Sequence, residues 1–187
     1  MPKLFIDTHN EKVTVAVVKD DKIIKKQGVS NRSHSEIVAP LLNELLRETN
    51  MEFADFDEIA VVNGPGSFTG VRIGVTIAKT IAYSLSIPIK VLSSLEMYGE
   101  SATEYFDLVT VEDSKGVYSA HKKENCYEEF IYQRKGEFEE YVSKNGFTVL
   151  KKHEINLKKI FEYLADRDEC NPHVVNPTYV KEIDALK

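Results

Sequence analysis

Residues 63–74 read Asn-Gly-Pro-Gly-Ser-Phe-Thr-Gly-Val-Arg-Ile-Gly and contain four of the nine glycines of the chain. This glycine segment stands between a strand-like apolar run at 59–62 and a long apolar pattern of helical period at 71–85. A glycine-rich turn from a strand into a helix is typical of phosphate binding, because the first amides of a helix are unpaired donors. The interpretation of the chain therefore depends on whether this segment can hold a phosphate.

The spacing of the glycine segment fits neither standard phosphate pattern. In a P-loop, Gly-Lys-Ser/Thr begins five residues after the first glycine. Five residues after Gly64 stands Thr69, and five residues after Gly66 stands Val71, so neither start places a glycine at that position. The dinucleotide-binding pattern has a third glycine five residues after the first, where Thr69 again stands. The strand expected next, at 87–92, leads into two serines instead of the acidic residue that binds a ribose.

The elements around the glycine segment alternate in type. The apolar pattern predicts three strands, a helix, a strand, a helix and a strand, at residues 4–6, 13–18, 23–27, 34–48, 59–62, 71–85 and 87–92. The pair Asp20-Asp21 suits a hairpin between the second and third strands, and Ser33 and Glu36 have capping-box spacing at the first helix. This order is typical of one lobe of the actin-like (ASKHA, RNase H-like) fold.

The second half of the sequence resembles a reduced copy of that lobe. Three strands, a short helix, a strand and a helix are expected at residues 108–111, 117–121, 129–132, 138–143, 147–150 and 157–164. We therefore expect an α/β fold with two lobes, a mixed sheet flanked by helices, and a smaller, degenerate second lobe. The first lobe would comprise residues 1–98 and the second residues 99–187.

The glycine segment also carries a specific resemblance. Residues 64–74 resemble the signature of the bacterial TsaB (YeaZ) family, and Ala78-Lys79 continues the match. The resemblance is dense over residues 1–98 and sparse beyond them, and it implies the same actin-like fold. Further matching segments are Ile6-Asp7-Thr8, His34-Ser35, Pro40-Leu41, Ser93-Ser94-Leu95-Glu96, 113–118 and 177–180.

The helix expected after the glycine segment has an unusually wide apolar arc. A stripe of small residues and a stripe of bulky residues each recur at every fourth position: Gly70, Gly74, Ala78 and Ala82, and Ile73, Ile77, Ile81 and Leu85. One side can rest on the sheet while another faces a further helix. That helix is either the chain's own helix at 34–48 or a helix of a partner protein.

The family resemblance favours the partner. TsaB-like proteins are understood to pair with TsaD, a paralogue of the same fold, through helices of their first lobes. In this chain the residues that would form that interface are Leu41, Leu42, Leu45, Gly74, Ile77, Ala78, Ile81 and Ala82. The resemblance thus implies a heterodimer with TsaD, while self-association through the same helices is the alternative in the absence of TsaD.

The resemblance also implies a division of labour in making N6-threonylcarbamoyladenosine next to the anticodon of tRNAs. A TsaC-type enzyme makes threonylcarbamoyl-AMP, TsaD transfers the group, and the ATPase TsaE supports turnover. ATP and threonylcarbamoyl-AMP are then used by the complex, no cofactor is expected on this chain, and tRNA is bound only through the complex. The chain would act as a non-catalytic subunit that favours one conformation of TsaD.

Few residues could support chemistry on the chain itself. Asp7 stands in the first turn, where the fold family holds metal and phosphate, but no glycine accompanies it, and we expect it to cap the turn. His34 has Val38 where the His-x-x-x-His metal motif of TsaD needs a second histidine. Ser67 lacks the spacing of a hydrolase nucleophile elbow and is expected to cap the following helix. We expect neither catalytic residues nor metal ligands.

The alternative is an enzyme, a small nucleotide-dependent kinase or ATPase of the same fold. Its phosphate would bind between the lobes, and the candidate contacts are Asp7, Gly64, Gly66, Ser67 and Gly70. Such an enzyme also needs a second phosphate loop, but glycine occurs only singly after residue 98. Arg72 and Lys79 are either solvated charges or contacts to a phosphate or to a partner carboxylate.

Composition sets further limits. The net charge is −6, with −1 on residues 1–98 and −5 on the rest, so we do not expect this chain alone to bind RNA tightly. Cys126 and Cys170 are expected to be free thiols. No apolar run approaches the length of a membrane span, and we expect a cytoplasmic protein without membrane association.

Overall fold

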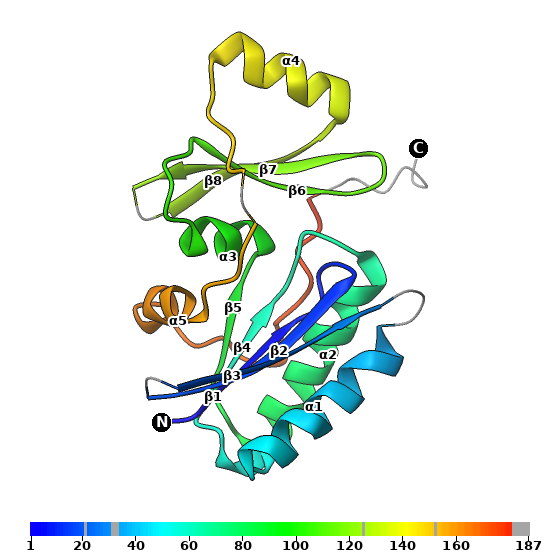
Figure 1. Ribbon diagram of the computed structural model, residues 1–187, viewed down its shortest axis with the longest axis vertical. Coiled ribbons are helices and arrows are strands. Elements are labelled where there is room, and N and C mark those ends of the chain that lie inside the picture. Colours follow the sequence, from blue (N-terminus) through cyan, green and yellow to red (C-terminus); the bar gives the residue numbers. More distant parts are fainter. Residues whose placement is uncertain (21, 31–33, 125, 152, 181–187) are drawn as a thin grey trace.

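The computed structural model describes residues 1–20, 22–30, 34–124, 126–151 and 153–180. They form two lobes stacked along the longest axis of the molecule, with the first half of the chain in the lower lobe of Figure 1. Two residues named above, Asp21 and Ser33, lie outside the described residues.

A five-stranded mixed sheet forms the first lobe. Its strands are β1 (Lys3–Asp7), β2 (Lys12–Lys19), β3 (Lys22–Val29), β4 (Glu58–Val62) and β5 (Ile89–Leu92), in the order β3-β2-β1-β4-β5. The first three strands pair antiparallel, and β1, β4 and β5 pair in parallel. All of β4 is buried, because both faces of the sheet are covered. The predicted mixed sheet of an actin-like lobe is confirmed.

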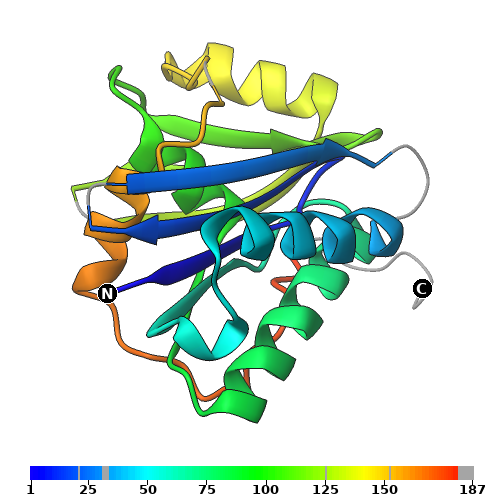
Figure 2. The same ribbon diagram turned by 60° about the horizontal axis from the view of Figure 1, so that its bottom comes forward.

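Two helices lie side by side on one face of this sheet (Figures 1 and 2), α1 (Ser35–Thr49) and α2 (Phe68–Leu85). Their inner residues share a core with alternate strand residues such as Leu4 and Ile6. The predicted helices are thus confirmed, and α2 begins three residues earlier than expected. A short 3-10 turn, Phe53–Asp55, precedes β4.

The opposite face of the sheet packs against the second half of the chain. Phe5, Ala60 and Leu92 contribute to a second core. Further contributors to that core come from α3 (Ser94–Ser101), α5 (Leu157–Ala165) and a three-stranded antiparallel sheet, β6 (Leu108–Glu112), β7 (Gly116–Lys123) and β8 (Cys126–Arg134). By contrast, α4 (Lys135–Asn145) has no buried residue and lies at the far end of the molecule (Figure 1). The second lobe therefore has fewer strands and less helical cover than the first.

Two features of the second half differ from the sequence-based expectation. The prediction of a strand at 147–150 is wrong, because these residues form only an isolated bridge, between Val149 and Leu108. The helix α3 was not expected, although Ser93 and Glu96 form the capping box that their spacing allows. The expected lobe division between residues 98 and 99 falls inside this helix.

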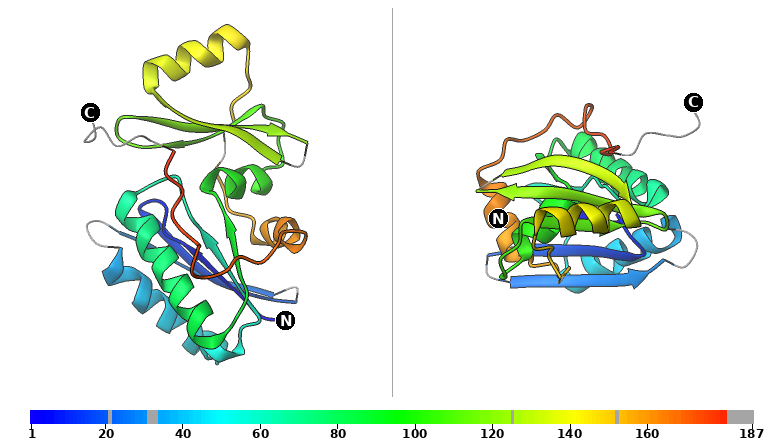
Figure 3. Two further views of the ribbon diagram at one scale, coloured as in Figure 1. Left: turned by 180° about the vertical axis from the view of Figure 1, so that it is seen from behind. Right: turned by 90° about the horizontal axis from the view of Figure 1, so that it is seen from above.

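The chain returns to the first lobe after α5. This return segment, residues 170–180, pairs with β5 through a 2.8 Å bond from the Cys170 N–H to the Ile89 carbonyl. Further along, the Thr178 N–H donates to the Asn63 carbonyl at 2.8 Å. The segment runs beside α2 on the side away from α1 (Figure 3). The expected second lobe, residues 99–187, includes this segment, although its Cys170 and Val175 pack against the core of the first lobe.

Candidate functional site

Three glycines of the glycine segment, Gly66, Gly70 and Gly74, face the chain's own β1–β2 turn. A Cβ atom at Gly66 would lie 2.2 Å from the His9 carbonyl oxygen, and one at Gly70 would lie 2.2 Å from the Thr8 carbonyl oxygen. At Gly74 it would lie 2.2 Å from the Thr8 hydroxyl oxygen. These distances are too short for any side chain, so the glycines let α2 pack directly on the end of β1. The space beside them is filled by protein.

Hydrogen bonds fix this contact from both sides. The Ser67 N–H donates to the His9 carbonyl at 2.6 Å, and the Thr8 hydroxyl donates to the Gly70 carbonyl at 2.7 Å. The Ser67 hydroxyl accepts from the Gly70 N–H at 3.2 Å, which confirms the expected helix cap. Gly64 adopts a φ of +96°, which allows the tight turn between β4 and α2.

A buried polar cluster lies beneath the turn. One carboxylate oxygen of Asp7 is 2.7 Å from His9 Nδ1 and accepts from the His9 N–H at 3.0 Å, so Asp7 caps the turn. The other oxygen has no hydrogen-bond partner within the described residues. His9 Nε2 faces the Tyr98 hydroxyl at 3.3 Å and the Asn10 amide at 3.1 Å. Burial, together with the nearby charge of Asp7, raises the pKa of Tyr98 well above its ordinary value.

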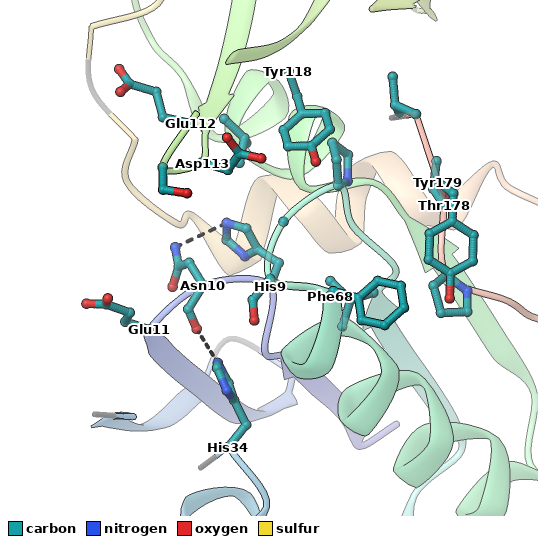
Figure 4. Close-up of a pocket in the computed structure, with 18 of the residues that line it drawn as sticks. His9, Asn10, Glu11, His34, Phe68, Glu112, Asp113, Tyr118, Thr178 and Tyr179 are labelled. Carbon is teal, nitrogen blue, oxygen red and sulfur yellow. Dashed lines mark hydrogen bonds between the residues drawn. The ribbon is translucent and has the colours of Figure 1, made fainter. Parts of the chain in front are cut away.

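A cleft of about 1180 Å³ separates the lobes (Figure 4). The β1–β2 turn and the start of α2 form its lower wall, and the turn between β6 and β7 forms the upper wall. Residues 177–180 of the return segment close one side. Two lobes around such a cleft define the class of protein, an actin-like two-lobed fold.

The charges of the cleft are mixed. Carboxylates of Glu11, Glu112 and Asp113 line it, together with the cations Lys12 and Lys115. The Asp113 carboxylate accepts the backbone N–H groups of Lys115 at 2.7 Å and of Gly116 at 2.8 Å, so it organises its own turn. Within the described ranges, no group of three or more His, Cys, Asp or Glu side chains could hold a metal ion.

The histidine at the start of α1 lies at the edge of the same cleft. His34 is the N-cap residue of α1 and makes no side-chain capping bond, whereas the capping-box spacing predicts the N-cap at Ser33. Its Nε2 lies 2.9 Å from the Asn10 carbonyl oxygen, so a ring N–H donates to that carbonyl (Figure 4). The single imidazole thereby ties the first helix to the β1–β2 turn.

The residues that sequence assigned to a partner interface fall into two groups. Five are buried within the chain, namely Leu42, Leu45, Gly74, Ala78 and Ala82. Three are half-buried, namely Leu41, Ile77 and Ile81. Ala78 is 0% exposed, so the small-residue stripe faces the chain's own sheet and turn instead of a second helix. The isoleucine row (Ile73, Ile77 and Ile81) lies on the outer side of α2 towards α1 and keeps part of its surface exposed.

Sequence reasoning missed the exposed aromatic residues on the other flank of α2. Phe68 and Tyr83 are 52% and 64% exposed, respectively, and lie next to the return segment. Their spacing along the helix places them on one stripe with Arg72 and Lys79, a signal that periodicity alone could have supplied.

Comparison with known proteins agrees with this architecture. Residues 14–114 match the family model of TsaD, described as tRNA N6-adenosine threonylcarbamoyltransferase. YeaZ from Pseudomonas aeruginosa shares the fold, with a TM-score of 0.77 and 19% identity over 95% of this chain and 100% of that one.

Curated relatives carry the name tRNA threonylcarbamoyladenosine biosynthesis protein TsaB. The relative from Bacillus subtilis (strain 168) is 40% identical over 111 residues, which are 59% of this chain and 48% of the relative. The relative from Haemophilus influenzae is 27% identical over 131 residues, or 70% of this chain and 54% of the relative. The chain thus spans about half the length of these two relatives. The chain belongs to the family that the matching model describes, and its relatives and fold place it among the TsaB (YeaZ) members.

The search for membrane-crossing helices in the described part of the chain gave none of sufficient length and apolarity.

Proposed function

We propose that this chain is a non-catalytic scaffold or activator that binds a TsaD protein. It would support TsaD in forming N6-threonylcarbamoyladenosine next to the anticodon of tRNAs. The names of the relatives and the match to the TsaD model support this role. The observation that carries the proposal is the isoleucine row of α2, whose side chains keep part of their apolar surface exposed. The helix that carries this row lies beside α1 (Figure 2).

The buried and half-buried groups explain how α2 could serve two purposes. Its inner side is already satisfied by the sheet and the β1–β2 turn, so it stabilises the lobe. Leu41, Ile77 and Ile81 keep exposed area that a second pair of helices could cover by packing ridges into grooves. The glycine segment would contribute by holding α2 at a fixed angle to the sheet.

The polar cluster supports a non-catalytic role. Asp7 and His9 form a pair that hydrolases use, but His9 Nε2 faces a phenol and an amide instead of a serine or cysteine. The raised pKa of Tyr98 keeps its hydroxyl protonated, which makes it a poor nucleophile. His9 is 0% exposed, so a substrate cannot reach the ring.

In this proposal the remaining chemistry belongs to other subunits. Threonylcarbamoyl-AMP and ATP would be used by the complex, with TsaE as an additional ATPase partner and tRNA bound only when the complex has formed in the cytoplasm. The chain would contribute a population shift, since a protein that binds one conformation of TsaD more tightly increases its share. Without TsaD, the same apolar row would favour a homodimer.

A second candidate function is a nucleotide-dependent kinase or ATPase, because the cleft between the lobes is large enough for a ligand. Its proposed phosphate contacts would be Asp7 and the backbone amides of the glycine segment. The contact of Gly66 with His9 and the carboxylates of Glu112 and Asp113 weigh against it. Calorimetric titration of the isolated chain with ATP and Mg²⁺ distinguishes the two functions, since micromolar binding would favour the enzyme.

The partner proposal is tested with an Ile77→Glu variant and the TsaD protein of the same organism. We expect loss of about 2 kcal/mol or more of binding free energy, because a charge replaces an apolar contact within a helix interface. The readouts are calorimetric affinity for TsaD and the modified nucleoside in tRNA measured by mass spectrometry.

A matched control is Ser143→Glu, which adds the same charge to an exposed site on α4 in the other lobe. It should bind TsaD and support tRNA modification like the unsubstituted chain. A folded Ile77→Glu variant with normal affinity and normal modification would contradict the proposed function.

A further inference from the structure

Exposed apolar side chains gather on the flank of α2 that faces away from α1. Among the described residues nine large hydrophobic side chains are exposed, and four of these lie on this flank or on the return segment: Phe68, Tyr83, Val174 and Tyr179. Leu85 continues the isoleucine stripe of α2, and the other four are scattered over both lobes. Clustered apolar surface of this kind marks a site of interaction, whereas single exposed hydrophobic residues are ordinary.

At one end of this flank an arginine lies between two aromatic rings. The Arg72 guanidinium carbon is 3.7 Å from the centroid of Phe68 and 5.6 Å from that of Tyr179. Arg72 Nε also donates to the Tyr179 hydroxyl at 2.8 Å. The two rings lie 5.9 Å apart, so the return segment and the helix together hold the cation in place.

At the other end a lysine and an aromatic ring of α2 both meet His173 of the return segment. Lys79 Nζ donates to the His173 carbonyl at 3.3 Å, and the ring of Tyr83 packs on that of His173 at 4.7 Å. Val174 follows directly and is 67% exposed. We name this surface the aromatic–cationic ridge; its members are Phe68, Arg72, Lys79, Tyr83, Val174 and Tyr179.

The charge of the ridge is one-sided. Residues 68–85 and 170–180 contain no Asp or Glu, although the whole chain has a net charge of −6. Within the part of the chain that the structure describes, Arg72 contacts two aromatic rings and a hydroxyl, Lys79 contacts a carbonyl, and neither forms an ion pair. A basic, carboxylate-free surface on an acidic protein is complementary to an acidic one.

We propose that the aromatic–cationic ridge is a second docking surface for the TsaD-type partner and receives an acidic, apolar segment of that protein. The inference rests on the proposed function, because α2 carries the isoleucine row on one flank and the ridge on the other. A carboxylate of the segment pairs with Arg72 or Lys79 while its apolar side chains cover Tyr83 and Val174. The partner would therefore hold α2 from both sides and would also fix the return segment.

An RNA strand is the competing occupant, since aromatic rings and cations also bind nucleic acid. Two observations favour protein. The ridge has two permanent cations, which would contact few phosphates in a chain of net charge −6. The ridge also includes the aliphatic and exposed Val174, which offers nothing for a base to stack on.

The test measures the affinity of the TsaD protein for a double variant, Arg72→Glu with Lys79→Glu. We expect a loss of about 10- to 100-fold, because two attractive charges become repulsive. The affinity of the unsubstituted chain should fall as salt rises, while that of the double variant should not. Lys158→Glu, on exposed surface of α5, is the matched control and should bind normally.

Further variants separate the outcomes. Circular dichroism checks whether the double variant folds. If it does not, Tyr83→Ala and the neutral pair Arg72→Gln with Lys79→Gln replace it, and each should lower the affinity for the TsaD protein. Unchanged TsaD affinity in the folded ridge variants overturns the inference, as does a selective loss of tRNA binding measured with the isolated chain. If Ile77→Glu also binds TsaD normally, the proposed function itself fails; if only Ile77→Glu loses affinity, the ridge alone is refuted.

Discussion

The two sides of α2 use different residues for different purposes. The inner side carries glycines and alanines that lie within contact of Thr8, His9 and the sheet, and Ala78 has no exposed surface. The outer side carries isoleucines, aromatic residues and two cations that keep exposed area. The glycine segment therefore specifies how closely the helix approaches its own lobe. The proposed interaction surface consists of other residues, the isoleucines, aromatic residues and cations of the same helix.

The largest expected contrast is between neighbouring residues on the two sides. Ala78→Glu should cost more than about 4 kcal/mol of unfolding free energy, because it places a charge in a packed core. Ile77→Glu should cost less than about 1 kcal/mol, since the carboxylate can reach water. Urea unfolding of both variants measures the difference, and similar losses would show that the two sides are not distinct.

A second test concerns the approach of α2 to the β1–β2 turn. Gly70→Ala should destabilise the chain by about 3 kcal/mol, because the new methyl group meets a backbone oxygen that cannot move away. The matched control is Gly136→Ala on α4, where nothing lies within 4 Å of the added atom. That control should leave stability unchanged or raise it by up to about 1 kcal/mol. Equal effects on the two midpoints of urea unfolding would refute the packing role.

These contrasts show what the sequence could predict. The order of strands and helices in the first lobe follows from apolar periodicity, and both stripes on α2 could be predicted from spacing alone. Which stripe faces inward could not, because that depends on Thr8 and His9 lying beside residues 66–74 after β1 and β4 have paired. Contacts between segments this far apart leave no local pattern.

The return segment illustrates the same limit. Residues 170–180 have no helical or alternating pattern, and their place beside α2 is set by bonds to Asn63, Arg72 and Lys79. The aromatic stripe on α2, by contrast, has a clear helical spacing, but it lies outside the two stripes that the aliphatic and small residues predict.

A third, smaller effect is expected at the N-cap of α2. Ser67→Ala removes the hydroxyl that accepts from the Gly70 N–H and should cost about 1 kcal/mol of unfolding free energy. Thermal unfolding followed by circular dichroism measures it. Ser143→Ala, on the exposed surface of α4, is the control, and a Ser67 variant as stable as this control would argue against the cap.

The smallest effect is a pH dependence from the buried polar cluster, to which α3 contributes Tyr98. Burial raises the pKa of Tyr98 above its ordinary value of 10.0. The contribution of Tyr98 to the free energy of unfolding is therefore complete below pH 10.0, and it declines above pH 10.0, where Tyr98 ionises in the unfolded chain. Half a pH unit above the ordinary value the loss should be about 0.8 kcal/mol. Tyr98→Phe should reduce the fall in urea stability between neutral and alkaline pH, whereas an unchanged slope would contradict the assignment.

The most direct test of the central claim is hydrogen–deuterium exchange of the full chain, alone, with the TsaD protein and with Mg²⁺-ATP. The claim is that the glycine segment orients a partner-binding helix and holds no nucleotide. It predicts that TsaD slows exchange in α1, α2 and the return segment, while Mg²⁺-ATP changes nothing. Slower exchange in the β1–β2 and β6–β7 turns with Mg²⁺-ATP, without protection of α2 by TsaD, would contradict it.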